Sequence, residues 1–330
     1  MRYFHFCSHE QFPPLDLLVQ ARRAQAAGFD GLACSDHLQP WWEPGEAANA
    51  WVWLGAAAQA TARIPFGTGV TPPGPRYHPV VIAQAWATFE AMFPGRPFLG
   101  VGSGEALNES PLGADWPPVR AQIELLEEAL GLIHRLFAGE RVTHEGTHFS
   151  ARRALLHTRP ARRPPLYVSA FGARAAGVAG RLGDGLWTLG DPESAPAVID
   201  AYRAAAEDAG RAPGEILLQV GFSWAPDDDA ALAGCRAWKA AQPPEFYKDE
   251  WDDPRAMQEK GAREVSDDDL RESFIVSSDP DVHIERIRAL ESLGATTIVL
   301  ANNSGADPLG AIDVYGQRVL PALRRARAGA

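Results

Sequence analysis

Short apolar runs alternate with segments of helical periodicity along most of the chain. The apolar runs are long enough for buried strands and lie at residues 3–7, 28–34, 64–70, 96–101, 166–169, 185–188, 216–222 and 297–301. The periodic segments predict helices at residues 14–27, 79–92, 195–209, 230–241, 281–293 and 309–326. The most regular helix is predicted after Pro117, where apolar side chains recur every three or four residues as far as Phe137, and Asp115 is expected to cap it.

Eight strands that alternate with helices are the pattern of a (β/α)8 TIM barrel, with a doubly wound open sheet as the alternative. No low-complexity linker or repeat divides the 330 residues, so a single barrel domain is predicted over residues 1–330. Residues 223–275 are rich in Asp, Pro and Trp, and they predict an insertion between strands seven and eight. Such an insertion usually covers or walls a site.

Residues suited to chemistry follow the carboxyl ends of the predicted strands. They include Glu10, the pair Asp36-His37, and the segments at residues 102–105 and 169–172. In a barrel these loops converge on one face, which predicts a single site there and favours the barrel over the open sheet.

The stretch at residues 98–109 begins as an apolar run and then carries glycine at every second position, followed by Glu105 and Asn108. Alternating glycines allow the backbone to approach a ligand closely, and the stretch then presents an acid. The spacing G-x-G-x-G does not match the dinucleotide-binding fingerprint G-x-G-x-x-G.

His37 and Glu105 are the predicted base and acid. An imidazole at the edge of a site exchanges a proton near neutral pH, and Trp41 and Trp42 beside it suit the stacking of a planar ring. Taken alone, His37 could be a strand-end histidine held by hydrogen bonds, and Glu105 an acid at a helix N-terminus. Their positions on two loops of one face favour catalysis.

Two further motifs have competing interpretations. The turn at residues 169–174 offers the N-terminus of a helix to a phosphate, with Arg174 nearby, or it is an ordinary βα turn. His144-Glu145-Gly146-Thr147-His148 matches the zinc pattern H-E-x-x-H, but Gly146 and the neighbouring β-branched residues predict a surface hairpin. No metal site is therefore predicted.

Composition narrows the class of protein. The net charge of −11 disfavours nucleic acid as a partner, because phosphate backbones need a basic surface. No apolar run approaches the ~20 residues that span a bilayer, and the N-terminal segment lacks the pattern of a signal peptide. Three cysteines without paired spacing indicate a reducing compartment. We expect a soluble cytoplasmic protein with no membrane partner.

Four segments of this sequence resemble the luciferase-like superfamily of flavin-dependent oxidoreductases, and more narrowly its branch of coenzyme F420-dependent glucose-6-phosphate dehydrogenases. The similar segments are Ser35-Asp36-His37-x-Gln39-Pro40-Trp41, Gly67-Thr68-x-Val70, Arg76-Tyr77-x-Pro79 and Gly102-x-Gly104-Glu105-Ala106-Leu107-Asn108-Glu109. The resemblance implies a barrel, usually a homodimer, that holds a flavin or deazaflavin at the carboxyl face.

The resemblance also implies roles for individual residues. His37 would deprotonate a substrate hydroxyl, Glu105 would protonate the reduced ring, Trp41 would shape the site, and Glu10 would assist at the substrate. The residues implied to contact the ring and side chain of the cofactor are Asp36, Gly69, Val70, Ser103, Gly104 and Asn108. The residues implied to bind its phosphate are Ala170, Phe171, Gly172 and Ala173. A cis peptide bond is implied between Gly69 and Val70.

The substrate and the cofactor stay open at this point. Lys248 matches one lysine that holds the substrate phosphate in the resembled branch, but Asp191 and Ser273 stand near the places of its two other cations, so glucose 6-phosphate is not the expected substrate. We expect hydride transfer between the cofactor and a small alcohol or carbonyl compound. Coenzyme F420 and FMN are both possible cofactors, because other segments of the sequence resemble a subgroup of the superfamily that is predicted to use FMN. The alternatives are an FMN-dependent monooxygenase, which would need a flavin reductase as partner, and a flavin-binding protein without catalysis.

Overall fold

The computed structural model describes residues 1–328, with side chains described as far as Arg325. Eight parallel strands pair in the closed order β1-β2-β3-β4-β7-β8-β9-β11 and back to β1, and the short strand β10 pairs only with β9. The barrel strands are β1 (Arg2–Cys7), β2 (Gly31–Cys34), β3 (Phe66–Thr68), β4 (Pro97–Val101), β7 (Leu166–Ser169), β8 (Gly185–Leu189), β9 (Glu215–Ser223) and β11 (Thr297–Asn302). The predicted (β/α)8 barrel is confirmed.

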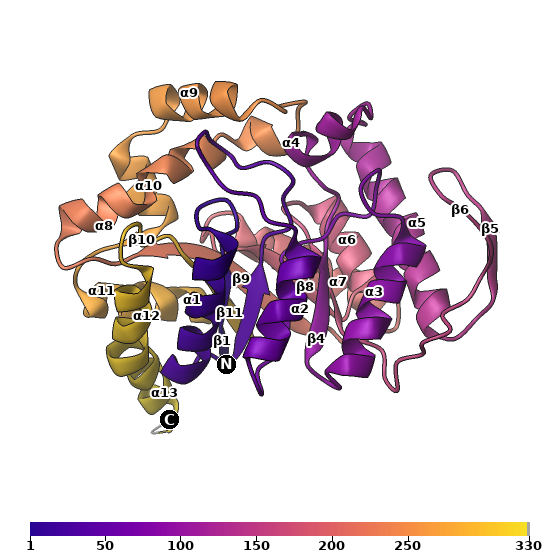
Figure 1. Cartoon of the computed structure of the whole chain (residues 1–330), viewed down its shortest axis with the longest axis horizontal. Helices are drawn as coiled ribbons and strands as arrows, with labels where there is room; N and C mark the ends of the chain where they lie inside the picture. The colour runs from indigo at the N-terminus through magenta and orange to yellow at the C-terminus, as the bar shows by residue number, and fades with distance from the viewer. Residues whose placement is uncertain (329–330) are drawn as a thin grey trace.

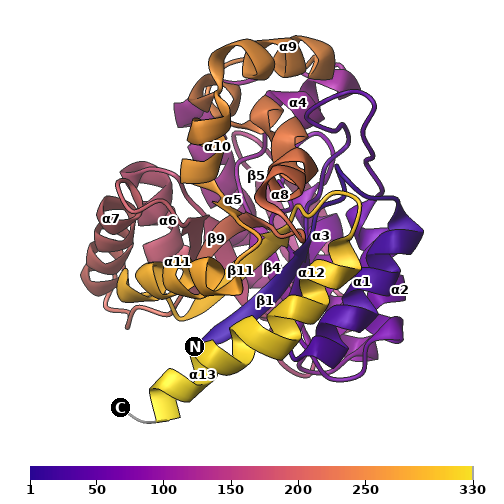
Figure 2. The same cartoon turned by 90° about the vertical axis from the view of Figure 1, so that its left-hand side faces the viewer.

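Helices surround the barrel strands (Figures 1 and 2). Those that follow barrel strands are α1 (Pro14–Ala27), α2 (Ala50–Ala60), α3 (Pro79–Met92), α4 (Ala106–Glu109), α5 (Val119–Phe137), α6 (Ala173–Leu182), α7 (Ala195–Asp208), α11 (Pro280–Ser292), α12 (Pro308–Val314) and α13 (Leu320–Ala328). Short 3₁₀ or π segments lie at η1 (Ser110–Leu112) and η4 (Tyr315–Val319). Helix α5 begins at Val119 with Pro118 at its N-cap, so the predicted cap at Asp115 is wrong.

The barrel interior is filled by large side chains rather than hollow. Phe6, Phe98 and Trp187 meet there as tilted or edge-on ring pairs. A Cβ atom on Gly69, where β3 ends, would lie 2.5 Å from the Trp187 ring. Because this packing closes the middle of the barrel, a ligand can be accommodated only at its ends.

The predicted insertion lies between β9 and β11. It consists of α8 (Asp228–Cys235), η2 (Arg236–Ala241), η3 (Pro244–Tyr247), α9 (Pro254–Glu264), α10 (Asp267–Ser273) and β10 (Ile275–Val276). In both views α9 and α10 lie with α4 at the end of the barrel opposite the chain's N-terminus, which is the carboxyl end of the strands (Figures 1 and 2).

The insertion is fastened to the loop that follows β2. Trp42 packs edge-on against Trp238 with ring centroids 5.1 Å apart, and Gln39 donates a hydrogen bond to the carbonyl of Asp252. Glu43 pairs with Arg255 at 2.5 Å. The loop and the insertion are therefore packed together above the barrel.

The H-E-x-x-H segment forms a hairpin, as predicted. Strands β5 (Val142–Glu145) and β6 (Ser150–Ala154) pair antiparallel beside α5. In the described part of the chain, no three His, Cys, Asp or Glu residues are grouped so that they could hold a metal ion. No helix among residues 1–328 is long and apolar enough to cross a bilayer.

Candidate active site

His37 lies between two carboxylates at the carboxyl end of the barrel. Its Nε2 atom is 3.4 Å from Oε2 of Glu105, and its Nδ1 atom is 3.5 Å from Oε1 of Glu10. The three side chains come from the loops after β2, β4 and β1, respectively. With Trp41, whose ring lies 5.3 Å from that of His37, the structure brings together all four residues for which a catalytic role was predicted.

Glu10 is buried and held in one orientation. Ser35 donates a hydrogen bond of 2.7 Å to its Oε2 atom, which leaves Oε1 directed toward His37. The backbone of Glu10 accepts a hydrogen bond from the amide of Glu46. A carboxylate fixed in this way presents a negative charge to one ring nitrogen of His37.

Glu105 retains its proton to higher pH than an exposed glutamate. Burial raises the pKa of its carboxyl, the charge of His37 opposes that rise, and the charge of Glu10 adds to it. A carboxyl with a raised pKa is suited to donate a proton at neutral pH.

Asn108 connects the Glu105 segment to the His37 loop. Its Oδ1 atom accepts hydrogen bonds from the amides of Leu38 and Gln39, at 2.8 and 3.2 Å. Its Nδ2 atom donates to Oε2 of Glu105 at 3.2 Å. Asn108 therefore fixes the spacing between the predicted base and the predicted acid.

Arg76 forms a second connection behind His37. Its guanidinium donates to Oδ1 and to the carbonyl of Asp36, and its Nε donates to Glu109 at 3.1 Å. Asp36 is only 2% exposed, and its Oδ2 accepts hydrogen bonds from Thr71 at 2.6 Å and from Trp51 at 3.1 Å. Asp36 was predicted to contact the cofactor. In this structure both oxygens of its carboxylate already accept hydrogen bonds from other residues of the protein.

The glycines of β4 bring two loops into direct contact. A Cβ atom on Gly100 would lie 2.0 Å from the carbonyl oxygen of Thr68, and one on Gly102 would lie 2.6 Å from Val70. Gly104 has φ +84°, a left-handed conformation that favours glycine. The peptide bond between Gly69 and Val70 is cis, as the resemblance implied. The predicted cofactor residues of β3 and β4 thus lie side by side.

The predicted phosphate turn is open to solvent. Ala170 is buried, but Phe171, Gly172 and Ala173 are exposed, and no atom lies within 4 Å of a Cβ built on Gly172. Helix α6 begins at Ala173, and no described side chain caps its N-terminus. Free amide groups at a helix N-terminus are suited to bind phosphate.

Aromatic rings border the site on the side of the insertion. The ring centroid of Trp41 lies 5.3 Å from that of His37, whereas Trp42 packs against the insertion and does not face His37. Tyr247, from η3, lies 5.4 Å from Trp41 and 5.7 Å from Phe171. Sequence reasoning missed Tyr247 and chose its neighbour Lys248, whose side chain is exposed.

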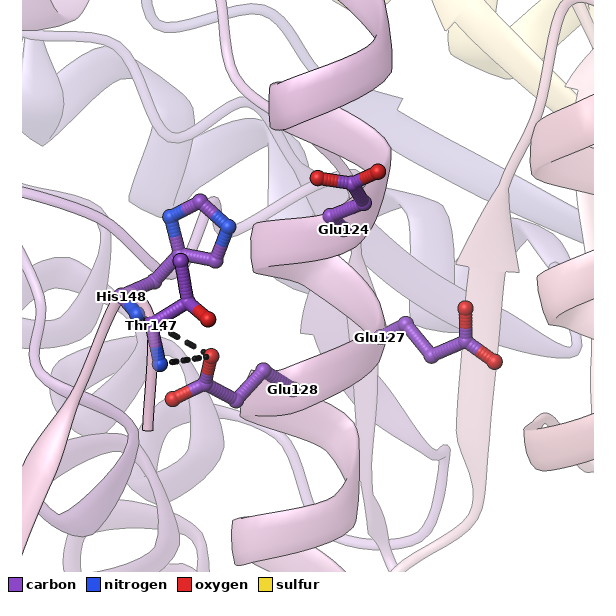
Figure 3. A pocket seen from close by; sticks show the side chains of 5 residues that line it. All are labelled: Glu124, Glu127, Glu128, Thr147 and His148. Carbon is purple, nitrogen blue, oxygen red and sulfur yellow. Dashed lines mark hydrogen bonds between the residues drawn. The ribbon is translucent and has the colours of Figure 1, made fainter. Parts of the chain in front are cut away.

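Two of the hollows on the described surface bear on the predicted sites. The first hollow is lined by Ser103, Glu109, Pro73, Gly74 and Trp116. It lies beside Ser103, which was predicted to contact the cofactor. The other lies against α5 and is lined by Glu124, Glu127, Glu128, Thr147 and His148 (Figure 3). Glu128 accepts hydrogen bonds there from the amides of Thr147 and His148. That second hollow shares no residue with the His37 site, and its acid Glu128 holds the hairpin.

Comparison with known proteins agrees with this geometry. The family model described as luciferase-like monooxygenase matches residues 1–297. The chain belongs to the luciferase-like monooxygenase family. The predicted superfamily is therefore confirmed.

This luciferase-like chain has relatives over nearly its whole length. It is 41% identical to an F420-dependent glucose-6-phosphate dehydrogenase of Microbacterium testaceum, over 98% of each chain. It is 36% identical to an F420-dependent hydroxymycolic acid dehydrogenase of Mycobacterium tuberculosis, over 96% of this chain and 87% of the relative. A solved F420-dependent secondary alcohol dehydrogenase, in complex with an F420-acetone adduct, is 34% identical with a TM-score of 0.94, covering 98% of this chain and 99% of that one.

Proposed function

We propose that this protein is an F420-dependent oxidoreductase that moves a hydride between the cofactor and a small alcohol or carbonyl compound. The observation that carries the proposal is the position of His37 between a fixed carboxylate, Glu10, and a carboxyl with raised pKa, Glu105. The relatives at 34–41% identity are F420-dependent dehydrogenases, which supports this cofactor over FMN.

His37 and Glu105 divide the proton chemistry between them. When bound, the deazaflavin accepts a hydride from the carbon that carries the substrate hydroxyl. A ring nitrogen of His37 takes the hydroxyl proton as the carbonyl forms, and Glu10 stabilises the resulting positive charge. Glu105, whose carboxyl has a raised pKa, would give its proton to the reduced ring, while His37 keeps the proton of the substrate hydroxyl. Trp41 excludes water from the ring of His37.

The residues present fit a cofactor of this kind. Gly69, Val70, Ser103, Gly104 and Asn108 follow the ends of β3 and β4, where a cis peptide and closely packed glycines bring the two backbones together. The uncapped N-terminus of α6, at the turn formed by residues 170–173, would hold the phosphate. The carboxylate of Asp36 is engaged by Thr71, Trp51 and Arg76, so Asp36 would act on the cofactor only through the loop that it holds.

The experiment is a parallel titration of the purified protein with coenzyme F420 and FMN, followed by tryptophan fluorescence, because Trp41 lies beside His37. Tight F420 binding, with F420 reduction by alcohols, is expected. Tight FMN binding and oxygen consumption with reduced FMN would favour the FMN-dependent monooxygenase, which needs a flavin reductase. Cofactor binding without turnover of any substrate would favour a non-catalytic flavin-binding protein.

We also propose a homodimer in the cytoplasm. Apolar side chains are exposed on neighbouring helices, with Leu15 on α1 and Val52 on α2 at 74% and 77% exposure. These helices pack side by side along one wall of the barrel (Figure 1). Exposed apolar groups of this kind mark a surface that a second copy covers. The three cysteines are buried free thiols, which suits a reducing compartment.

A further inference from the structure

We propose that Tyr247, together with Trp41 and Phe171, forms an aromatic wall that selects an uncharged, apolar alcohol as the substrate. This inference rests on the proposed hydride transfer and names the substrate class of the same site. It assigns the selection to the insertion, which contributes Tyr247, rather than to the charged side chain of Lys248 beside it.

The three rings come from separate parts of the fold and meet in a continuous row. Trp41 belongs to the loop after β2, Phe171 to the turn after β7, and Tyr247 to the insertion. The ring of Tyr247 lies between the other two, at centroid distances of 5.4 and 5.7 Å. Trp41 in turn contacts His37 at 5.3 Å. The row therefore runs from the predicted base to the predicted phosphate turn.

Tyr247 presents a ring to its neighbours, not a hydroxyl. Its Oη atom donates a hydrogen bond of 2.8 Å to the carbonyl of Ala241, within the insertion. Burial raises the pKa of the hydroxyl, and the charges of Glu105 and Glu10 add to that rise. The Tyr247 side chain is therefore uncharged, and it lies close enough to Glu10 and Glu105 for their charges to act on it.

The charges around the site oppose an anionic substrate. Glu10 and Glu105 flank His37, and Arg76, whose charge also lowers the pKa of Glu105, is already paired with Asp36 and Glu109. In the insertion, Lys239 pairs with Asp267 and Lys260 with Glu245, each at 2.8 Å. A phosphorylated substrate would face two carboxylates without a cation held in place to bind it.

The experiment compares kcat/KM of the F420-loaded protein for 2-propanol, 2-butanol, cyclohexanol and glucose 6-phosphate. We expect kcat/KM to rise with apolar size along the alcohols and glucose 6-phosphate to be at least 100-fold poorer than cyclohexanol. Y247A should lower kcat/KM for cyclohexanol at least 10-fold, mainly through KM, and should leave the F420 affinity unchanged. Y247F should stay within about twofold of wild type.

Y202F is the matched control, because the Tyr202 hydroxyl accepts a hydrogen bond from the amide of Gly214 away from the site. Preference for glucose 6-phosphate, or an unchanged alcohol series in Y247A, would overturn the aromatic wall while the hydride transfer stands. If F420 binds but no alcohol reduces it, the proposed function fails. A second measurement is the quenching of Trp41 fluorescence. Quenching by cyclohexanol but not by glucose 6-phosphate, which Y247A should abolish, would support the aromatic wall. If cyclohexanol does not quench Trp41 in the wild type, the aromatic wall is overturned.

Discussion

At the scale of single residues, the site depends on two glutamates that differ in their surroundings. Ser35 donates to Glu10 and fixes it, while Glu105 sits where burial raises its pKa. His37 contacts both. Two carboxyl groups placed in unlike environments can divide into a charge-stabilising group and a proton donor, and these are the parts that we propose for Glu10 and Glu105.

Removal of the His37 imidazole should abolish most of the turnover while leaving the binding of F420 largely intact. We expect H37A to lower kcat by about 10²–10⁴-fold, the usual contribution of a general base. F420 affinity should stay within a few-fold of wild type, since the backbone at β3 and β4 is unchanged. Stopped-flow F420 reduction and fluorescence titration measure the two quantities. Wild-type reduction rates in H37A would remove His37 from the proton transfer.

The raised pKa of Glu105 has a consequence for stability. A carboxyl whose folded-state pKa lies above its unfolded value is favoured when protonated, so its contribution is present at low pH and is lost as the pH rises through the folded pKa. E105Q, which stays neutral, should match wild type in thermal stability near pH 4 and exceed it at pH 8. Melting temperatures across that range measure this. A constant difference at all pH values would contradict the raised pKa.

At the scale of elements, the short helix α4 holds the loop after β2 in register with β4. Asn108 bonds the backbone just after His37, and Glu109 reaches Asp36 through Arg76. The predicted base and the predicted acid are therefore carried by two loops that these contacts hold together.

Loss of the Arg76 charge should be costly, because it leaves two buried carboxylates without their partner. We expect R76Q to lower the free energy of unfolding by about 3–5 kcal/mol, as for other broken buried ion pairs. The control R120Q, which removes an exposed pair with Glu124 on α5, should change it by less than about 1 kcal/mol. Urea unfolding compares the two. Equal effects would mean that Arg76 does not hold the loops together.

The strands and most helices could be predicted because buried parallel strands and amphipathic helices have distinct periods. Helix α2 was missed because its sequence is almost uniformly apolar and shows no polar face. Helix α5 starts later than predicted, since Pro118 rather than Asp115 precedes its first turn.

Within the site, His37, Glu105 and Glu10 could be predicted because each follows a strand of the barrel. The part played by Arg76 could not, because Asp36, Arg76 and Glu109 lie on three loops whose contact depends on the folded chain. Tyr247 lies in a 3₁₀ segment without periodicity, so its orientation could not be read from the sequence. The roles of the predicted cofactor residues stay predictions.

At the scale of the whole molecule, the wall formed by α1, α2 and α3 carries several exposed apolar side chains. Leu15 and Val19 on α1, Val52 on α2 and Val81 on α3 are exposed apolar side chains. The two active sites of a dimer joined there would be independent, since His37 and its partners belong to the loops at the barrel's carboxyl end.

A charge at the centre of this wall should separate the subunits. We expect V52E to sediment as a monomer under conditions in which wild type is a dimer, because burying an unpaired carboxylate at an interface is unfavourable. V282E is the control, since Val282 is 38% exposed on α11, a different helix. Sedimentation velocity measures both. If the wild type is a monomer, no such interface exists. If V52E leaves the dimer intact, the interface lies elsewhere.

The attachment of the insertion to the loop after β2 sets a rule for exchanging parts between relatives. Gln39 reaches the backbone of Asp252, Glu43 pairs with Arg255, and Trp42 packs on Trp238. A chimaera that receives a foreign insertion alone would inherit mismatched partners at all three contacts. Residues 38–43 therefore need to be exchanged together with residues 224–274, so that all three contacts keep their partners.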